Sequence, residues 1–245
     1  MEDFSGFYKL TLEERLVKVK RAAGLSEEEV QLLRDSGALK LDRADKVVEN
    51  VIGAAHLPLG LATHFTINGK SMVIPMAVEE PSVIAAASRA AKQTLPEGFK
   101  ADSDESIMIG QVQLTQIEDV KEATRNIELN RKEIMGVAAL HMKQHERFGC
   151  GARDFEVKVI DTDRGQMVVA YFHIAVGDAQ GANMVNTVLE NVAPTLAQLT
   201  GGKVRLRIVS NLATKRKARA SAVWKKDVIG EETVEGVLDA YEFAR

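Results

Sequence analysis

The segment Gly177-Asp178-Ala179-Gln180-Gly181-Ala182-Asn183-Met184-Val185-Asn186-Thr187 decides the fold, because it joins a predicted strand at Gln166–Val176 to a predicted helix at Asn183–Leu199. Glycine and alanine let a backbone approach a ligand closely, and the N–H groups at a helix start favour a pyrophosphate. The pattern G-x-G-x-x-G is absent, so the segment does not support a doubly wound dinucleotide fold. Taken alone, it is also compatible with an ordinary turn between a strand and a helix.

The surrounding pattern predicts an α/β unit. One long helix is expected over 117–143, and Asp163-Arg164-Gly165 is expected to turn a hairpin. The predicted strands of this unit cover residues 107–114, 155–161, 166–176 and 204–209. The polar run Lys100–Ser106 precedes the unit and is typical of a domain boundary. We therefore expect a compact small domain inserted into a larger one.

The flanking regions carry strong local signals. Capping-box patterns begin predicted helices at Thr11 and Ser26, and Asn68-Gly69 indicates a type I′ hairpin turn. The second helix should end near Ser36, before Gly37. The remaining predicted elements are a helix at 42–50, strands at 62–67 and 71–78, a helix at 82–94, a helix from about 212, a strand at 220–225 and a helix from 232. The basic run Lys215–Arg219 is expected to be a solvated helix face.

Two adjacent carboxylates, Glu79 and Glu80, stand between the apolar run Met72–Val78 and the segment that begins with Pro81. In an extended segment they would point to opposite faces, so they do not form a two-carboxylate hydrolase site. Proline biases Glu80 to an extended conformation and can open the following helix. Such a glutamate suits proton donation, but composition alone favours a solvated strand end followed by an acid at the helix start.

Composition limits the class of protein. The chain has 245 residues, of which 45% are hydrophobic and 27% charged, and a formal net charge of −3. These values predict one or two globular domains without general attraction to nucleic acid or an anionic membrane. The single cysteine, Cys150, excludes an internal disulfide and fits a reducing cytoplasm. With no basic leader, no long apolar run and no metal-ligand spacing among the five histidines, we expect a cytoplasmic protein without a metal site.

Four further motifs occur in a characteristic order: Glu49-Asn50-Val51-Ile52-Gly53, Leu57–Ala62, Phe65–Lys70 and Val78–Ser82. With the segment at Gly177, they closely resemble the hydroxymethylglutaryl-CoA (HMG-CoA) reductase family, in the short soluble form of bacteria and archaea, class II. The resemblance runs from about Gly6 to the last residue. It implies an α+β fold in which a small α/β domain, ferredoxin-like and non-Rossmann, is inserted into a helical large domain. The implied ranges are 1–105 for the first part of the large substrate-binding domain and 106–211 for the inserted dinucleotide-binding domain. Residues 212–245 would be the truncated return of the chain to the large domain.

The resemblance also implies site residues. Glu80 would be the catalytic acid, with Glu79 facing away, and Ser82 would contact the hydroxymethylglutaryl group; a helix N-cap is the structural alternative for this serine. The loop is similar to the family's Asp-Ala-Met-Gly-Ala-Asn segment, with Gln180 in place of methionine. The residues that would line the dinucleotide site are Asp178, Gly181, Ala182, Asn183 and Asn211. The cofactor is expected to be NADH or NADPH, and the sequence leaves that choice open.

The implied activity is the reduction of HMG-CoA to mevalonate and CoA, or the reverse, through two hydride transfers. The family takes a lysine, an aspartate and a histidine from sequence that follows the segment matching Val237–Ala244. We therefore expect this chain to be an N-terminal portion, truncated at Arg245 and inactive alone, that forms a homodimer or assembles with the missing half. The alternative is a non-catalytic module that retains nucleotide binding or dimerisation.

Overall fold

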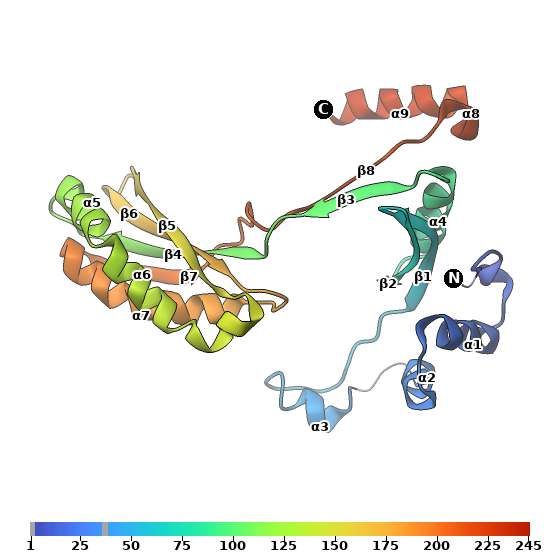
Figure 1. The fold of residues 1–245 in the computed structure, drawn as a ribbon, viewed down its shortest axis with the longest axis horizontal. Helices are drawn as coiled ribbons and strands as arrows, with labels where there is room; N and C mark the ends of the chain where they lie inside the picture. The colour runs from blue at the N-terminus through green and yellow to red at the C-terminus, as the bar shows by residue number, and fades with distance from the viewer. Residues whose placement is uncertain (1–2, 36–38) are drawn as a thin grey trace. The chain divides into compact units, whose positions relative to one another are not determined.

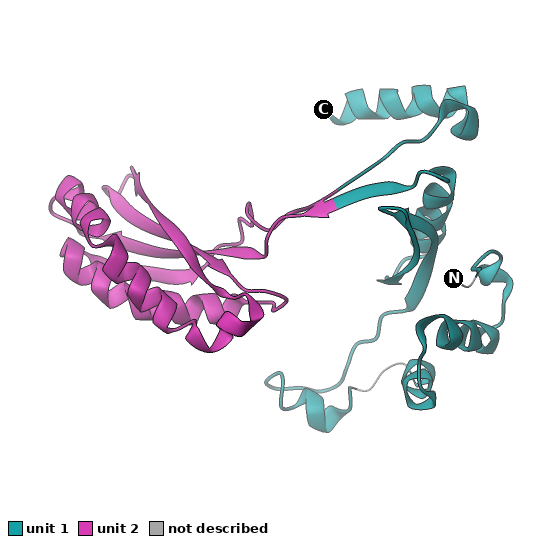
Figure 2. Ribbon diagram, viewed as in Figure 1, with its two compact units in different colours: residues 1–101, 220–245 teal, residues 102–219 magenta. Residues whose placement is uncertain are grey.

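The computed structural model describes residues 3–35 and 39–245. Figure 2 shows two compact units, the first formed by Met1–Ala101 with Ala220–Arg245 and the second by Asp102–Arg219. These described residues form two four-stranded sheets, in the orders β2-β1-β3-β8 and β5-β6-β4-β7, together with helices in both units. The fold is therefore α+β, as predicted.

The helices at the start of the first unit begin where the capping boxes predict. α1 (Leu12–Ala23) and α2 (Glu27–Arg34) follow Thr11 and Ser26, whose hydroxyl groups each accept from the backbone three residues later. A short 3-10 helix, η1 (Phe7–Lys9), precedes them. The predicted end of the second helix at Ser36 and Gly37 lies outside the described residues. The third helix, α3, covers only Leu41–Ala44, so the prediction of a helix to Asn50 is wrong.

The sheet of the first unit is built on a hairpin. β1 (Leu59–Ile67) and β2 (Lys70–Ala77) pair antiparallel, and Asn68 and Gly69 between them have φ angles of 50° and 77°, as a type I′ turn requires. Two further strands, β3 (Phe99–Ser103) and β8 (Ala218–Ala222), complete the sheet. β3 occupies the polar run expected as a boundary and was not predicted as a strand.

Helix α4 (Val83–Gln93) packs on this sheet through a serine. The N–H of Thr63 in β1 donates to Oγ of Ser88 at 3.0 Å, and that hydroxyl donates to the carbonyl of Ile84 at 2.8 Å. A Cβ on Gly60 would lie 2.5 Å from Cδ1 of Ile84, so the strand and helix approach closely. The small residues Gly60 of β1 and Ser88 of α4 therefore lie where the strand and the helix meet.

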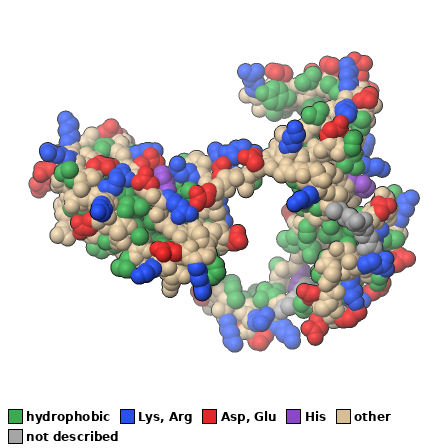
Figure 3. Space-filling view, in the orientation of Figure 1, with side chains coloured by type: hydrophobic (Ala, Val, Ile, Leu, Met, Phe, Trp, Pro, Cys, Tyr) green, Lys and Arg blue, Asp and Glu red, His purple; other side chains and the backbone are tan. Residues whose placement is uncertain are grey.

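The end of the chain returns to the first unit. The indole Nε1 of Trp224 donates to the carbonyl of Ala90 at 3.0 Å, and its ring lies edge-on to Phe99 at 6.1 Å. α8 (Lys226–Ile229) and α9 (Glu231–Ala244) follow. Figure 3 shows exposed hydrophobic side chains on α9, which include Val237, Leu238, Tyr241 and Phe243.

In the region before β8 the structure differs from two predictions. Residues 212–217 form turns and bends instead of the predicted helix, so the basic run is not a helix face. Arg219 forms an ion pair with Asp104 at 2.7 Å, and the backbones of Lys217 and Asp104 are linked by the bond from Asp104 N–H to the carbonyl of Lys217 at 2.8 Å. Pairing with these partners favours an extended chain over a helix here.

The second unit has the element order β-α-α-β-β-α-β (Figure 1). Its elements are β4 (Ile107–Thr115), α5 (Val120–Leu129), α6 (Arg131–Leu140), the 3-10 helix η2 (Lys143–Phe148), β5 (Gly151–Ile160), β6 (Met167–Ala175), α7 (Ala182–Thr200) and β7 (Lys203–Val209). The pairs β5–β6, β6–β4 and β4–β7 are all antiparallel. The predicted hairpin turn is confirmed, because Gly165 N–H donates to the carbonyl of Thr162 at 2.9 Å.

The core of this unit lies between one face of its sheet and the helices α5, α6 and α7 (Figure 1). Alternate residues of the strands face inward, including Leu114, Phe155 and Phe172, which are almost fully buried. Leu189 and Leu196 of α7 cover them with no exposed surface. The opposite face carries Gln111, Gln113, Glu156 and Lys158 together with apolar residues such as Val169, which fits a sheet whose helices cover one side.

The single helix predicted over 117–143 is wrong, because the chain breaks at Asn130. This residue ends α5 and begins α6 with φ −101° and ψ 15°. Its side-chain amide donates to the carbonyl of Asn126 at 2.8 Å, a local bond of the kind by which asparagine competes with helix geometry. Ile127 and Ile134, on the two sides of the break, both lie in the core, where neither is exposed.

Candidate functional site

The predicted cofactor segments meet at one end of the second unit's sheet. β6 and β7 both run antiparallel to β4, so the residues after each strand lie beside the start of β4. Val176 N–H donates to the carbonyl of Ser106 at 3.0 Å, and Ser210 N–H donates to that of Ile109 at 2.7 Å. The loop 177–181 and Asn211 therefore emerge on the two sides of the same strand.

Close packing fixes both glycines of this loop. A Cβ on Gly177 would lie 2.9 Å from the carbonyl oxygen of Phe148 and 3.3 Å from Sγ of Cys150. Gly181 has φ 92° and is buried, and a Cβ there would lie 2.8 Å from both Sδ of Met108 and the side chain of Val176. Only glycine suits both the contact and the backbone at this second position.

The loop ends in the first turn of α7 without a side-chain N-cap. Gly181 occupies the N-cap position, and the N–H of Ala182 donates instead to Oε1 of Gln180 at 3.0 Å. Asp178 and Asn183 are exposed, and Ala182 is half-buried. The departure from the family pattern at Gln180 thus has a structural role, because its side chain binds the amide of the first helical residue.

Asn186 is a site residue that the sequence analysis did not assign. Its Oδ1 accepts from the N–H of Val209 at 2.9 Å, which joins the start of α7 to the end of β7. Asn211, two residues beyond Val209, is exposed, and Ser210 Oγ accepts from the N–H of Leu212 at 3.2 Å. No local sequence signal identifies this tether, since an asparagine inside a helix has no fixed partner.

A cavity of about 300 Å³ lies beside the contact between Gly177 and Cys150. It is lined by Ala139, Met142, Glu146, Gly149, Cys150, Gly151, Ala152 and Arg153. The guanidinium of Arg153 binds Oε1 of Glu105 at 2.7 Å and the carbonyl of Gly149 at 3.0 Å. The cavity thus presents a carboxylate at Glu146 and a guanidinium already paired with another carboxylate.

Glu79, Glu80 and Ser82 belong to the first unit, and all are exposed. The two glutamates lie in a bend directly after β2, outside the strand itself. Ser82 has φ 72° and ψ −20°, a left-handed conformation that is uncommon for residues other than glycine. It occupies the N-cap of α4, yet its hydroxyl accepts no hydrogen bond from the helix. The capping alternative therefore does not account for this serine.

Within each unit the structure gathers part of the predicted set. Asp178, Gly181, Ala182, Asn183 and Asn211 lie in the second unit, at the sheet end described above. Across residues 3–35 and 39–245, no three His, Cys, Asp or Glu side chains form a group that could hold a metal ion. Nor does any helix of the described chain have the length and apolar character needed to cross a membrane.

Comparisons with known proteins all match this chain to members of one family. A sequence model of the family described as hydroxymethylglutaryl-coenzyme A reductase matches residues 11–245. The 3-hydroxy-3-methylglutaryl-coenzyme A reductase of Archaeoglobus fulgidus is 51% identical over 241 residues, which cover 98% of this chain and 55% of the relative. A probable reductase of the same name from Borreliella burgdorferi is 29% identical over 177 residues, 72% of this chain and 40% of the relative. The chain spans about half the length of the curated relatives it matches.

Solved structures agree. The class II 3-hydroxy-3-methylglutaryl-CoA reductase of Streptococcus pneumoniae, bound to NADPH in open conformations, superposes with a TM-score of 0.87 at 34% identity. The match covers 96% of this chain and 64% of that one. Another structure of the reductase from the same organism gives the same TM-score and identity over 94% of this chain.

Proposed function

Because the chain belongs to the hydroxymethylglutaryl-CoA reductase family, we propose that it forms part of an enzyme that reduces HMG-CoA to mevalonate and CoA, or catalyses the reverse reaction. The reduction consumes two molecules of NADH or NADPH and two protons. The observation that carries the proposal is the convergence of the Gly177–Asn183 loop and Asn211 at one sheet end.

In this proposal the second unit binds the dinucleotide. Asp178, Gly181, Ala182, Asn183 and Asn211 contact the cofactor, with the pyrophosphate at the start of α7. The Streptococcus pneumoniae relative that is 34% identical was solved with NADPH, which supports a nicotinamide dinucleotide as the ligand. The strand order β5-β6-β4-β7, with its helices on one face, supports a ferredoxin-like small domain inserted into a larger, more helical one.

The first unit supplies the substrate contacts. Glu80 donates a proton to the oxygen that gains negative charge when hydride adds to the carbonyl carbon. Ser82 contacts the hydroxymethylglutaryl group through a hydroxyl that the helix does not use. Its left-handed backbone costs about 1 kcal/mol or more, and such strain is often retained at ligand-binding positions. The working enzyme is a cytoplasmic homodimer or an assembly with a polypeptide that completes the family's length.

A reconstitution assay tests this function. The chain is mixed with a polypeptide covering the remaining length of a relative, and oxidation of NADH or NADPH is followed by absorbance with HMG-CoA present or absent. HMG-CoA-dependent oxidation that yields mevalonate is the expected result. Binding of neither nucleotide by calorimetry, together with no oxidation in the mixture, would refute the proposal.

A second candidate is a non-catalytic nucleotide-binding module. It is favoured by one observation, namely that every predicted cofactor residue lies within the second unit. The same experiment separates the two functions. Nucleotide binding without HMG-CoA-dependent oxidation in the reconstituted mixture favours the module, whereas oxidation favours the reductase.

A further inference from the structure

Arg216 binds the backbone of the proposed cofactor loop. Its Nη1 donates to the carbonyl of Gln180 at 3.2 Å, and its Nη2 donates to the carbonyl of Ala179 at 3.1 Å. The arginine belongs to the basic run that the sequence predicted to be a solvated helix face. Both contacts lie inside the second unit, so they join two segments of one compact body.

These two bonds fix the direction of two consecutive peptide groups. In a planar trans peptide, the C=O of one residue and the N–H of the next point in opposite directions. When the carbonyls of Ala179 and Gln180 face Arg216, the N–H groups of Gln180 and Gly181 face away from it. Within the part of the chain that the structure describes, neither N–H donates to a protein acceptor. The loop therefore presents two adjacent donors, the arrangement by which backbone nests bind anions.

The loop is held at three places. Gly177 abuts Cys150, Gly181 abuts Met108, and the forked guanidinium of Arg216 holds the exposed peptides between them. An arginine suits the middle position because its planar fork offers two parallel N–H groups at a fixed spacing, whereas a lysine offers a point charge.

We propose that Arg216 is a positioning residue for the nicotinamide dinucleotide, and that it acts by orienting the N–H groups of Gln180 and Gly181 toward the pyrophosphate. The inference rests on the proposed cofactor role of the loop. Arg216 itself lies on the carbonyl side and does not touch the ligand.

The test compares three variants by calorimetric titration with NADH and NADPH. Arg216→Ala should weaken binding of both nucleotides by about tenfold, the usual scale for losing charge-assisted hydrogen bonds. Arg216→Lys keeps the positive charge but loses the forked guanidinium. Its affinity for both nucleotides should therefore be closer to that of Arg216→Ala than to that of the unaltered chain. Lys217→Ala removes a neighbouring charge that interacts with the Asp104 carboxylate, and it should change affinity less than twofold.

Two-dimensional amide NMR adds a readout that a general loss of stability would not give. In Arg216→Lys, the Gln180 and Gly181 amide signals should move while those of the sheet and the melting temperature remain unchanged. The proposal is overturned if Arg216→Lys binds like the unaltered chain, or if Lys217→Ala loses as much affinity as Arg216→Ala. If the unaltered chain binds neither nucleotide, the cofactor role fails, and unmoved amide signals in Arg216→Lys would then overturn the orienting role separately.

Discussion

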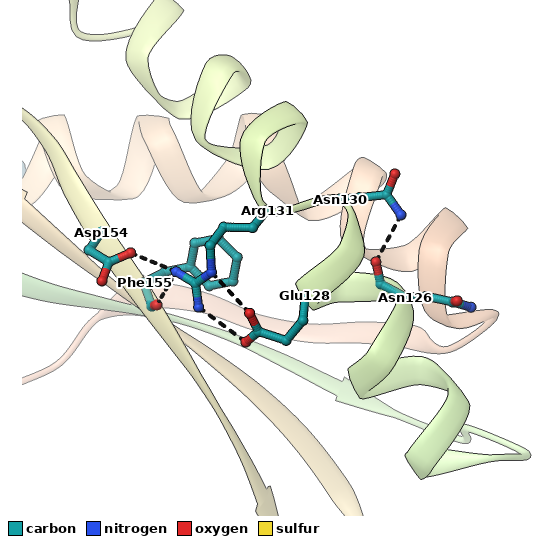
Figure 4. A network of polar contacts seen from close by, with 6 residues as sticks. All are labelled: Asn126, Glu128, Asn130, Arg131, Asp154 and Phe155. Atoms are coloured by element: carbon teal, nitrogen blue, oxygen red, sulfur yellow. Dashed lines mark hydrogen bonds and ion pairs between the residues drawn. The ribbon is translucent and has the colours of Figure 1, made fainter.

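The guanidinium of Arg131 donates to the carboxylate of Asp154 at 2.6 Å and thereby joins α6 to β5 (Figure 4). The same group binds Glu128 at 2.9 Å and the carbonyl of Phe155 at 2.8 Å, and it lies 4.2 Å from the Phe155 ring centroid. Because Arg131 directly follows the break at Asn130, these contacts fix the direction in which the helix resumes.

Replacing Arg131 with methionine should lower the free energy of unfolding by about 1–2 kcal/mol, because the charge-assisted bonds to Asp154 and Glu128 and the cation–π contact are lost together. Urea unfolding followed by circular dichroism measures the change. Lys132→Met, one residue along on the exposed side of α6, is the control and should alter stability by less than about 0.5 kcal/mol. Equal losses in the two variants would contradict the structural role of the Arg131 network.

A methyl group on Gly110 should destabilise the second unit by about 1–3 kcal/mol, since overpacking forces neighbours to move. Its Cβ would lie 2.7 Å from Cγ1 of Val185 and 2.8 Å from Cδ1 of Leu189. Gly136→Ala in α6 is the matched control, because its Cβ would meet nothing within 4 Å beyond its chain neighbours and its own helix backbone. That variant should be stabilised by about 0.5–1 kcal/mol from helix propensity, as thermal unfolding can show. A neutral result for Gly110→Ala would argue against the close approach of β4 and α7.

Burial lowers the pKa of the His173 imidazole below its ordinary value of 6.5, with Lys215 acting in the same direction and Glu156 and Asp154 opposing it. The unfolded chain therefore takes up a proton near pH 6.5, before the folded chain does, and stability should fall as the pH drops from about 7.5 to 5.5. NMR titration of the imidazole should give a pKa below 6.5.

His173→Gln should reduce that acid sensitivity relative to the unaltered chain. Urea midpoints at the two pH values make the comparison. An imidazole that titrates at or above 6.5 in the folded chain would contradict the burial effect.

Glu80→Gln should lower the rate of the reconstituted reductase by about a hundredfold or more, on the scale of a lost general acid. Glu79→Gln should be tolerated far better. Steady-state oxidation of NADH or NADPH with HMG-CoA measures both, and nucleotide binding by calorimetry confirms that each variant is folded. Comparable losses from the two changes would refute the assignment of Glu80 as the acid.

Local predictions succeeded where the interacting groups are close in sequence. The capping boxes at Thr11 and Ser26 and the hairpin at Asn68-Gly69 each depend on groups within about four residues. The prediction of one helix over 117–143 was wrong because an asparagine side chain ends the helix. Hydrophobic periodicity gives no signal for such a break. The prediction that the basic run is a solvated helix face was wrong because the partners of this run, Asp104 and the loop carbonyls, are remote in the chain.

The sequence by itself determined most element positions and the loop at Gly177, since these follow from short-range backbone preferences and spacing, and the resemblance of its motifs to a known family implied the α+β class. Only the tertiary structure decided which residues stabilise that loop. Arg216 is 36 residues from Gln180, and Asn186 is 23 residues from Val209. Antiparallel pairing of β6 and β7 with β4 brings these groups to one sheet end, and contacts set by pairing register cannot be read from neighbours in the chain.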